Sequence, residues 1–312
     1  MQFPFTLKQG TDFDVVGFGT NAVDFLIRVP HYPEFNSKVE LIDYAQAAGG
    51  EIATTMVGLG RLGMRCSYVG RFGMDGAGDI GYESLKLEGV DLTHAERIDG
   101  ALTQIAFIVI DERNGERTVI WKRDEKLHYR EADVPLAAIA NAKVLHVSPH
   151  DTRACARLAV EARRRGTVVS IDIDRVSDGV DDLLRSVDVI VASADFPQKL
   201  LGIDDTQDAL REMQARFGAG VVGVTLGEAG SLLLCEGNFI ETRAFAVPGG
   251  CKDTTGAGDS FRVGLIYGMI EGMSVEDSAK AANAVAALKC RAVGARTSLP
   301  GRNELNAFLK KS

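Results

Sequence analysis

The sequence predicts an α/β fold in which helices cover both faces of a mostly parallel central sheet. Short apolar runs alternate with segments of helical length over most of the chain. The runs, such as VVSIDID at residues 168–174, are apolar almost throughout, which is typical of parallel strands buried on both faces. The length of 312 residues is compatible with one large domain or two smaller ones. Because no long linker interrupts the chain, we expect a single domain over residues 1–312.

The expected elements follow one another mostly in strand–helix order, and several helices end at a glycine. We expect strands at residues 14–19, 67–73, 143–148, 168–174, 187–193 and 221–227. We expect helices at residues 51–63, 76–89, 152–165, 257–272, 275–289 and 303–310.

Two segments break this order. Residues 27–48 contain two prolines and show no helical period. In residues 103–122, the runs TQIAFIVID and RTVIWK flank ERNG, which predicts a hairpin. We expect the two segments to form a small antiparallel sheet outside the main one. A lid over an active site and an edge used for homodimer formation are both compatible with such a sheet.

Composition excludes several classes of function. The net charge of −8 argues against a nucleic-acid partner. No run approaches the ~18 apolar residues that span a membrane, and the start lacks a basic segment followed by an apolar one. The cysteines are scattered without CxxC spacing, which favours reduced thiols and a cytoplasmic location. They are Cys66, Cys155, Cys235, Cys251 and Cys290.

The run DTTGAGDSF, residues 253–261, is the strongest functional motif. Small residues at the start of a helix leave backbone N–H groups uncovered, and the helix dipole favours an anion there. Gly256, Ala257 and Gly258 are therefore expected to bind a phosphoryl group. Asp259, in the first helical turn, could accept a proton from a substrate hydroxyl.

This run resembles the second signature of the PfkB (ribokinase-like) family of carbohydrate kinases. The resemblance implies a ribokinase-like three-layer fold with a mostly parallel central sheet and a small β-sheet lid. It also implies ATP and Mg²⁺ as cofactors and transfer of the γ-phosphoryl group to a sugar hydroxymethyl group. Asp259 would be the base, and the amides of residues 256–258 would stabilise the phosphoryl oxygens. The residues near Pro33, Lys38 and the glycine pair are most similar to ketohexokinase-like bacterial sugar kinases.

A glycine pair, Gly49 and Gly50, lies between an expected strand and an expected helix. It resembles the first signature of the family, GGxxxN, in which the Asn binds sugar hydroxyls. Thr54 stands at the Asn position and offers one hydroxyl in place of an amide, which favours a substrate other than ribose. Asp24 matches the family's Asp that accepts hydrogen bonds from sugar hydroxyls.

The run TLGEAGSLL begins at Thr225 and resembles the family's nucleotide loop. Gly227 and Gly230 would lie at the carboxyl edge of the sheet, where α/β proteins bind ligands. By resemblance, Asn283 would lie near the adenine. The family's NxxE motif, which helps to arrange magnesium-bound water, is altered. Ser193 stands in place of its Asn, and Phe196 in place of its Glu, with Asp195 as the nearest carboxylate.

The family also has a monovalent cation site, which Asp253, Thr255, Gly294 and Ser298 match in spacing. The resemblance thus implies K⁺ as a further cofactor.

Substrate identity stays open at this stage. Lys38, together with Lys122 or Arg123, would suit an anionic sugar if they faced the pocket, although solvated charge is favoured. Lys122 and Arg123 cannot both face it, because neighbouring strand residues point to opposite faces. His146 is expected in the core. A nucleoside kinase and a non-catalytic sugar or nucleotide sensor are the alternatives to a sugar kinase.

Overall fold

The computed structural model describes residues 1–139 and 141–311 and contains an eight-stranded central sheet. Its strands β12-β11-β10-β9-β1-β4 are parallel, and β13 and β14 extend the sheet with antiparallel pairing. The predicted mostly parallel central sheet is therefore confirmed. The strands are β1 Phe13–Phe18, β4 Cys66–Val69, β9 Ala142–Val147, β10 Val168–Ile173, β11 Val189–Ser193, β12 Val221–Thr225, β13 Ser231–Cys235 and β14 Asn238–Thr242.

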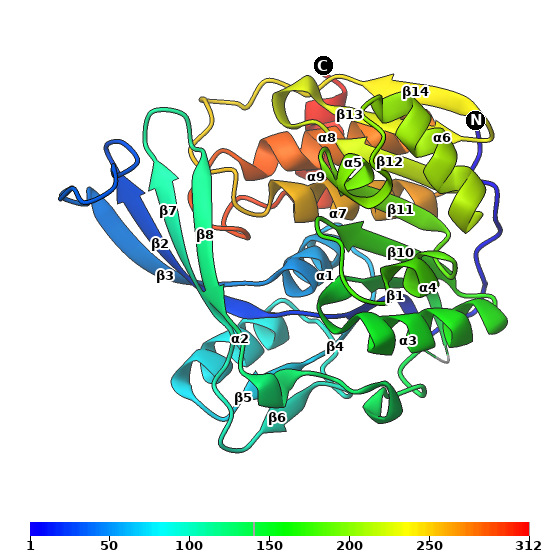
Figure 1. Ribbon diagram of the computed structural model, residues 1–312, viewed down its shortest axis with the longest axis horizontal. Helices are drawn as coiled ribbons and strands as arrows, with labels where there is room; N and C mark the ends of the chain where they lie inside the picture. The colour runs from blue at the N-terminus through cyan, green and yellow to red at the C-terminus, as the bar shows by residue number, and fades with distance from the viewer. Residues whose placement is uncertain (140, 312) are drawn as a thin grey trace.

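Helices cover both faces of this sheet, which confirms the three predicted layers (Figure 1). Neighbouring strand residues point to opposite faces, so Val15 packs into one hydrophobic core and Val16 into the other. The first core includes side chains of α1 Glu51–Arg61, α2 Gly76–Leu87, α7 Ala257–Ile270, α8 Val275–Lys289 and α9 Arg302–Leu309. The second includes side chains of α3 Thr152–Arg164, α4 Val180–Leu184, α5 Phe196–Leu201 and α6 Thr206–Phe217.

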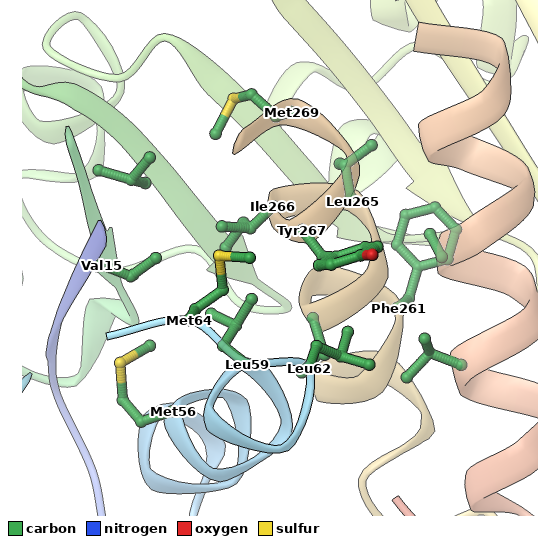
Figure 2. Packing of buried hydrophobic residues seen from close by; sticks show 14 of the residues in the cluster. Val15, Met56, Leu59, Leu62, Met64, Phe261, Leu265, Ile266, Tyr267 and Met269 are labelled. Carbon is green, nitrogen blue, oxygen red and sulfur yellow. The ribbon is translucent and has the colours of Figure 1, made fainter. Parts of the chain in front are cut away.

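Helices α1 and α7 pack against each other in the first core. Figure 2 shows Leu59 of α1 near Ile266 of α7 in this core. The two helices are in close contact at Gly58, where a Cβ atom would lie 2.5 Å from Cγ2 of Val263. A larger residue at position 58 would therefore force the helices apart.

A separate four-stranded sheet projects beside the main body, in the order β3-β2-β7-β8 (Figure 1). The predicted β7–β8 hairpin is confirmed, but β2 pairs with β7 in parallel, so the expectation of an antiparallel sheet is wrong for this pair. Parallel pairing is possible because a long crossover, residues 30–104, connects the two strands. The first strand of this sheet begins at Ala22, before the expected segment 27–48. Its strands are β2 Ala22–Val29, β3 Asp43–Gly49, β7 Ile105–Asp111 and β8 Arg117–Lys122.

The segment expected as one strand at residues 67–73 is interrupted at Gly70. Its second part, β5 Arg71–Gly73, pairs with β6 Glu96–Ile98 in a small two-stranded sheet. Short 3₁₀ turns occur at Glu125–Leu127, Glu131–Asp133, Pro149–Asp151 and Gly227–Ala229. All five cysteines are free. Within the described ranges, every helix is too short or too polar to cross a bilayer.

Candidate active site

A cavity of about 1000 Å³ opens at the carboxyl ends of β10, β11 and β12. Its walls come from the central sheet, the small sheet, and the ends of α1, α7 and α8. The carboxyl edge of a parallel sheet is where α/β proteins place their ligand sites. Residues expected at the phosphoryl, sugar and nucleotide sites, among them Asp259, Asp24 and Asn283, thus line one cavity.

The predicted phosphoryl-binding run lies at the amino-terminal end of α7. Gly256 is the N-cap, with φ of 76°, and Ala257 opens the helix. A Cβ atom at Gly256 would lie 2.9 Å from that of Ala295, so a side chain would meet both strained backbone and a packed neighbour. Gly256, Ala257, Gly258 and Asp259 all line the cavity. The prediction that Asp259 occupies the first helical turn is confirmed.

The Asp259 carboxyl is surrounded by other acids. Burial raises its pKa well above the ordinary value, and the nearby carboxylates of Asp172 and Glu51 raise it further. The cations of Arg262 and Arg117 act in the opposite direction. A carboxylate whose pKa is raised binds a proton more readily, which suits a general base.

Arg262 is a buried residue of this site that the sequence analysis missed. Its guanidinium forms an ion pair with Asp172, with a separation of 2.7 Å between Nη2 and Oδ1. It also donates to the carbonyl oxygens of Gly258 at 3.0 Å and Val191 at 2.9 Å. Arg262 therefore connects the first turn of α7 to β10 and β11. Its position one turn after Asp259, on a helix apolar all round, is the sequence signal that could have found it.

Asp24 and the glycine pair lie together on the side of the cavity that β2 and the start of α1 form. Asp24 lines the cavity and is 4% exposed, and burial raises its pKa to about 6. A Cβ atom at Gly49 would lie 2.0 Å from Oδ2 of Asp24, so only glycine leaves room for this carboxylate. Gly50, with φ of 89°, caps α1 and lines the cavity.

Thr54 does not line the cavity; it is completely buried and accepts a hydrogen bond from Nε of Arg296 at 3.2 Å. Arg296 also donates to Oγ of Ser84 at 3.0 Å and to the carbonyl oxygen of Gly49. Its charge favours the ionised form of Asp24. Sequence analysis missed Arg296, although it lies in the AVGARTSLP run that supplied Gly294 and Ser298.

Three buried polar atoms of the cavity lining form no hydrogen bond within the protein. They are Oγ1 of Thr20, Oε1 of Gln104 and Nδ1 of His150, and all three side chains are almost buried and line the cavity. Nδ1 of His150 forms no hydrogen bond but lies 3.5 Å from Oε2 of Glu51. Burial lowers the pKa of His150 to about 3, so its ring is neutral near pH 7. Glu51 also lines the cavity, and burial together with Asp172 and Asp174 raises its pKa to about 8. Unpartnered buried polar groups cost free energy unless a ligand or water satisfies them.

The five residues expected at the nucleotide end all line the cavity: Ser193, Thr225, Gly227, Gly230 and Asn283. Gly230 has φ of 101°, and a Cβ atom there would lie 2.0 Å from the carbonyl oxygen of Thr242. The Asn283 amide donates to Oγ of Ser231 and the Ala279 carbonyl oxygen, both at 3.0 Å. Sequence analysis missed the small and apolar residues that complete this end, which are Ala244, Phe245, Ala246, Val247, Ala286, Ala287 and Cys290.

The altered NxxE segment offers little for metal binding. Phe196 is completely buried in the second core. The Asp195 carboxylate accepts from the Ser193 hydroxyl at 2.8 Å, pairs with Lys199 and lies outside the cavity lining. Elsewhere in residues 1–139 and 141–311, no three His, Cys, Asp or Glu side chains gather as a metal site. Magnesium commonly keeps water and phosphate oxygens as ligands, so it needs no such cluster.

The four residues expected at a monovalent cation site come together around Asp253. Its Oδ1 accepts from the Thr255 amide at 2.8 Å, and its Oδ2 accepts from the Gly294 amide at 2.7 Å. Ser298 donates to the carbonyl oxygen of Lys289 at 2.5 Å. The Lys289 ammonium group, which sequence analysis did not consider, lies in the same cluster.

The remaining candidates lie outside the cavity lining: Lys38, Lys122, Arg123 and His146. Arg123 forms a buried ion pair with Asp151, with 2.9 Å between Nη2 and Oδ2. His146 is completely buried in the central sheet, as expected, and Nδ1 lies 3.3 Å from Oγ of Ser170. None of these residues supplies the cavity with a positive charge.

Comparison with known proteins agrees with this geometry. A family model described as pfkB family carbohydrate kinase matches residues 13–302. The chain belongs to this family. As a pfkB member, it is a sugar or nucleoside kinase, a phosphotransferase that uses ATP.

Two relatives and one solved structure illustrate the range of the family. The chain is 26% identical to a ribokinase of Haemophilus influenzae, with 94% of this chain and 97% of the relative covered. It is 27% identical to a nucleoside kinase of Methanothermobacter thermautotrophicus, with 94% of each covered. The crystal structure of a putative ribokinase from Agrobacterium tumefaciens superposes with a TM-score of 0.87 at 26% identity, covering 96% of this chain and 98% of that one. This likeness confirms the ribokinase-like fold.

Proposed function

We propose that the protein transfers the γ-phosphoryl group of ATP to a hydroxymethyl group of an uncharged sugar. The main support is the position of Asp259, which lines one cavity together with Asp24 and the backbone of residues 256–258. Magnesium would arrive bound to the ATP phosphates.

In the proposed mechanism, Asp259 accepts the proton of the sugar hydroxyl as its oxygen bonds to the γ-phosphorus. The bond from this phosphorus to the bridging oxygen breaks, and ADP leaves. The amides of Gly256, Ala257 and Gly258 stabilise the phosphoryl oxygens by donating hydrogen bonds. The small sheet would act as a lid that excludes water and limits ATP hydrolysis.

The charges around the acceptor end support an uncharged substrate. The carboxyl groups of Asp24, Glu51 and Asp174 line the cavity together with the cations of Arg117 and Arg175, whereas Arg262 is already paired with Asp172. A sugar phosphate or sugar acid would add an anion among carboxyl groups whose ionisation is already opposed. The unpartnered groups of Thr20, Gln104 and His150, described above, would instead bind sugar hydroxyls.

A nucleoside is the second candidate acceptor. Trp121 of β8 lines the cavity, and its ring lies edge-on to His150 with 5.7 Å between the ring centroids. An aromatic side chain in this place could stack on a nucleobase.

A panel of free sugars, sugar alcohols, sugar acids, sugar phosphates and nucleosides, assayed for ADP release, tests the proposal. We expect an uncharged sugar to give the highest kcat/KM. Asp259→Asn should lower kcat by about 10³-fold or more, with unchanged thermal stability, because the proton acceptor is lost. Background ADP release across the whole panel would contradict the proposal and favour a non-catalytic sensor.

We also propose a homodimer formed through the small sheet. On the face turned away from the cavity, Phe25 stacks on Phe107 with 5.0 Å between centroids, and Ile120 and Tyr44 are largely exposed. A second copy of this face would cover the patch. Ile120→Lys should convert a dimer into a monomer in light scattering, and a wild-type monomer would contradict the proposal.

A further inference from the structure

Lys289, the last residue of α8, is a completely buried lysine. Its Nζ donates to the carbonyl oxygen of Asp253 at 2.7 Å and lies 3.8 Å from Oδ2 of the same residue. Asp253 is also completely buried. A buried ammonium group is stable only with such partners, so this pair is a built feature of the fold.

The pair lies within the expected monovalent cation site. Of its four candidate ligands, Asp253 alone carries a negative charge, and Lys289 already compensates that charge. Both carboxylate oxygens are further bound by backbone amides, as described above. A potassium ion added here would lie beside a positive charge in surroundings of low dielectric constant, where repulsion is strong. These residues therefore do not fit a second cation.

We propose that the ammonium group of Lys289 takes the place of the monovalent cation, so that the protein needs no K⁺. Asp253 opens the run that ends at the amides of residues 256–258, and the ammonium group holds its carbonyl oxygen and carboxylate. Lys289 is thus a positioning residue that acts on the phosphoryl-binding amides through Asp253. The effect on kinase turnover rests on the function proposed above, whereas the effect on stability does not.

The experiment compares the wild type with Lys289→Met in potassium, ammonium and choline chloride at equal ionic strength. Wild-type thermal unfolding and kcat should be the same in all three salts. Lys289→Met should unfold at a lower temperature and lose on the order of 10²-fold in kcat, because the amides shift from their positions. Potassium or ammonium, which fit the vacated space, should restore part of both losses, and choline should restore neither.

Lys280→Met is the matched control, since Lys280 lies on the same helix but is exposed and paired only with Asp277. It should behave as the wild type in every salt. A wild type that gains several-fold in kcat, or several degrees in unfolding temperature, on exchange of choline for potassium would overturn the proposal. Lys289→Met with wild-type turnover and unfolding temperature would also overturn it. If no acceptor is phosphorylated, the unfolding temperatures still test whether Lys289 replaces the cation. If Lys289→Met does not fold, the comparison of the wild type in the three salts tests it.

Discussion

The backbone amide and the hydroxyl of Thr254 both donate to the carbonyl oxygen of Gly115, at 3.0 and 3.1 Å. Gly115 lies in the turn of the β7–β8 hairpin, and Thr254 lies two residues before Gly256, the N-cap of α7. Arg117, the first residue of β8, also donates to the Thr254 hydroxyl at 3.3 Å. The tip of the small sheet is therefore fastened to the loop that leads into α7.

Gly115→Ala should lower kcat/KM and raise the ratio of ATP hydrolysis to sugar phosphorylation. A Cβ atom at Gly115 would lie 3.0 Å from Sγ of Cys251 and 3.1 Å from the Asp253 amide nitrogen, which would push the hairpin tip away. Gly237→Ala is the control, because Gly237 has a similar φ of 78° but no atom within 4 Å of the added Cβ. Equal kinetic effects of the two substitutions would show that backbone strain alone is responsible.

The pH dependence of kcat/KM should shift in opposite directions in two variants. In the proposed mechanism Asp259 must lose its proton to act as a base, so kcat/KM should fall as the pH falls through its pKa. Glu51→Gln removes a carboxyl that raises this pKa, so the acid limb should move to lower pH. Arg117→Ala removes a positive charge that lowers the pKa of Asp259, so the acid limb of the profile should move to higher pH. Glu212→Gln on the exposed face of α6 is the control, and shifts of the same sign in both variants would contradict the assignment.

Arg262→Met should destabilise the fold by about 3 kcal/mol, because it leaves the Asp172 carboxylate buried without its partner. Arg211→Met is the control. Arg211 pairs with Asp208 at the surface, and such pairs contribute at most about 1 kcal/mol. Urea unfolding measures the loss of stability in both variants. The double variant Arg262→Met/Asp172→Asn should recover part of the loss seen in Arg262→Met. Similar losses in the two single variants would contradict the role of the buried pair.

Asp14 should make stability depend on pH in the acid range. Burial opposes its ionisation, but hydrogen bonds from Arg65 and Lys143 outweigh this and lower its pKa to about 2. The folded-state pKa is therefore below the unfolded value of about 3.9, so the contribution is complete above that pH and disappears as the pH falls through about 2. The difference in unfolding temperature between the wild type and Asp14→Asn should shrink over this range. A difference in unfolding temperature that stays constant with pH would contradict this role of Asp14. Asp204→Asn at the surface is the control.

The sequence predicted the parts of the molecule that short-range patterns determine. Apolar runs located the parallel strands, and GAGD located the start of α7 with Asp259 in its first turn. Arg296 and Lys289 escaped prediction because a buried cation is defined by partners distant in sequence. Arg296 binds Gly49 and Thr54, more than 240 positions earlier. The parallel pairing of β2 with β7 was missed for the same reason, since no local signal specifies a partner across a long crossover.

The close approach of Gly58 to Val263 also affects the cavity, which lies at the amino-terminal ends of the same two helices. Helix α1 presents Gly50 and Glu51 to the cavity, and helix α7 presents the run from Gly256 to Asp259. Because the two helices pack directly against each other, as Figure 2 shows, their contact fixes the distance between these two groups of cavity residues. In the proposed mechanism, the distance between acceptor and phosphoryl donor therefore depends on the volumes of side chains packed in the hydrophobic core.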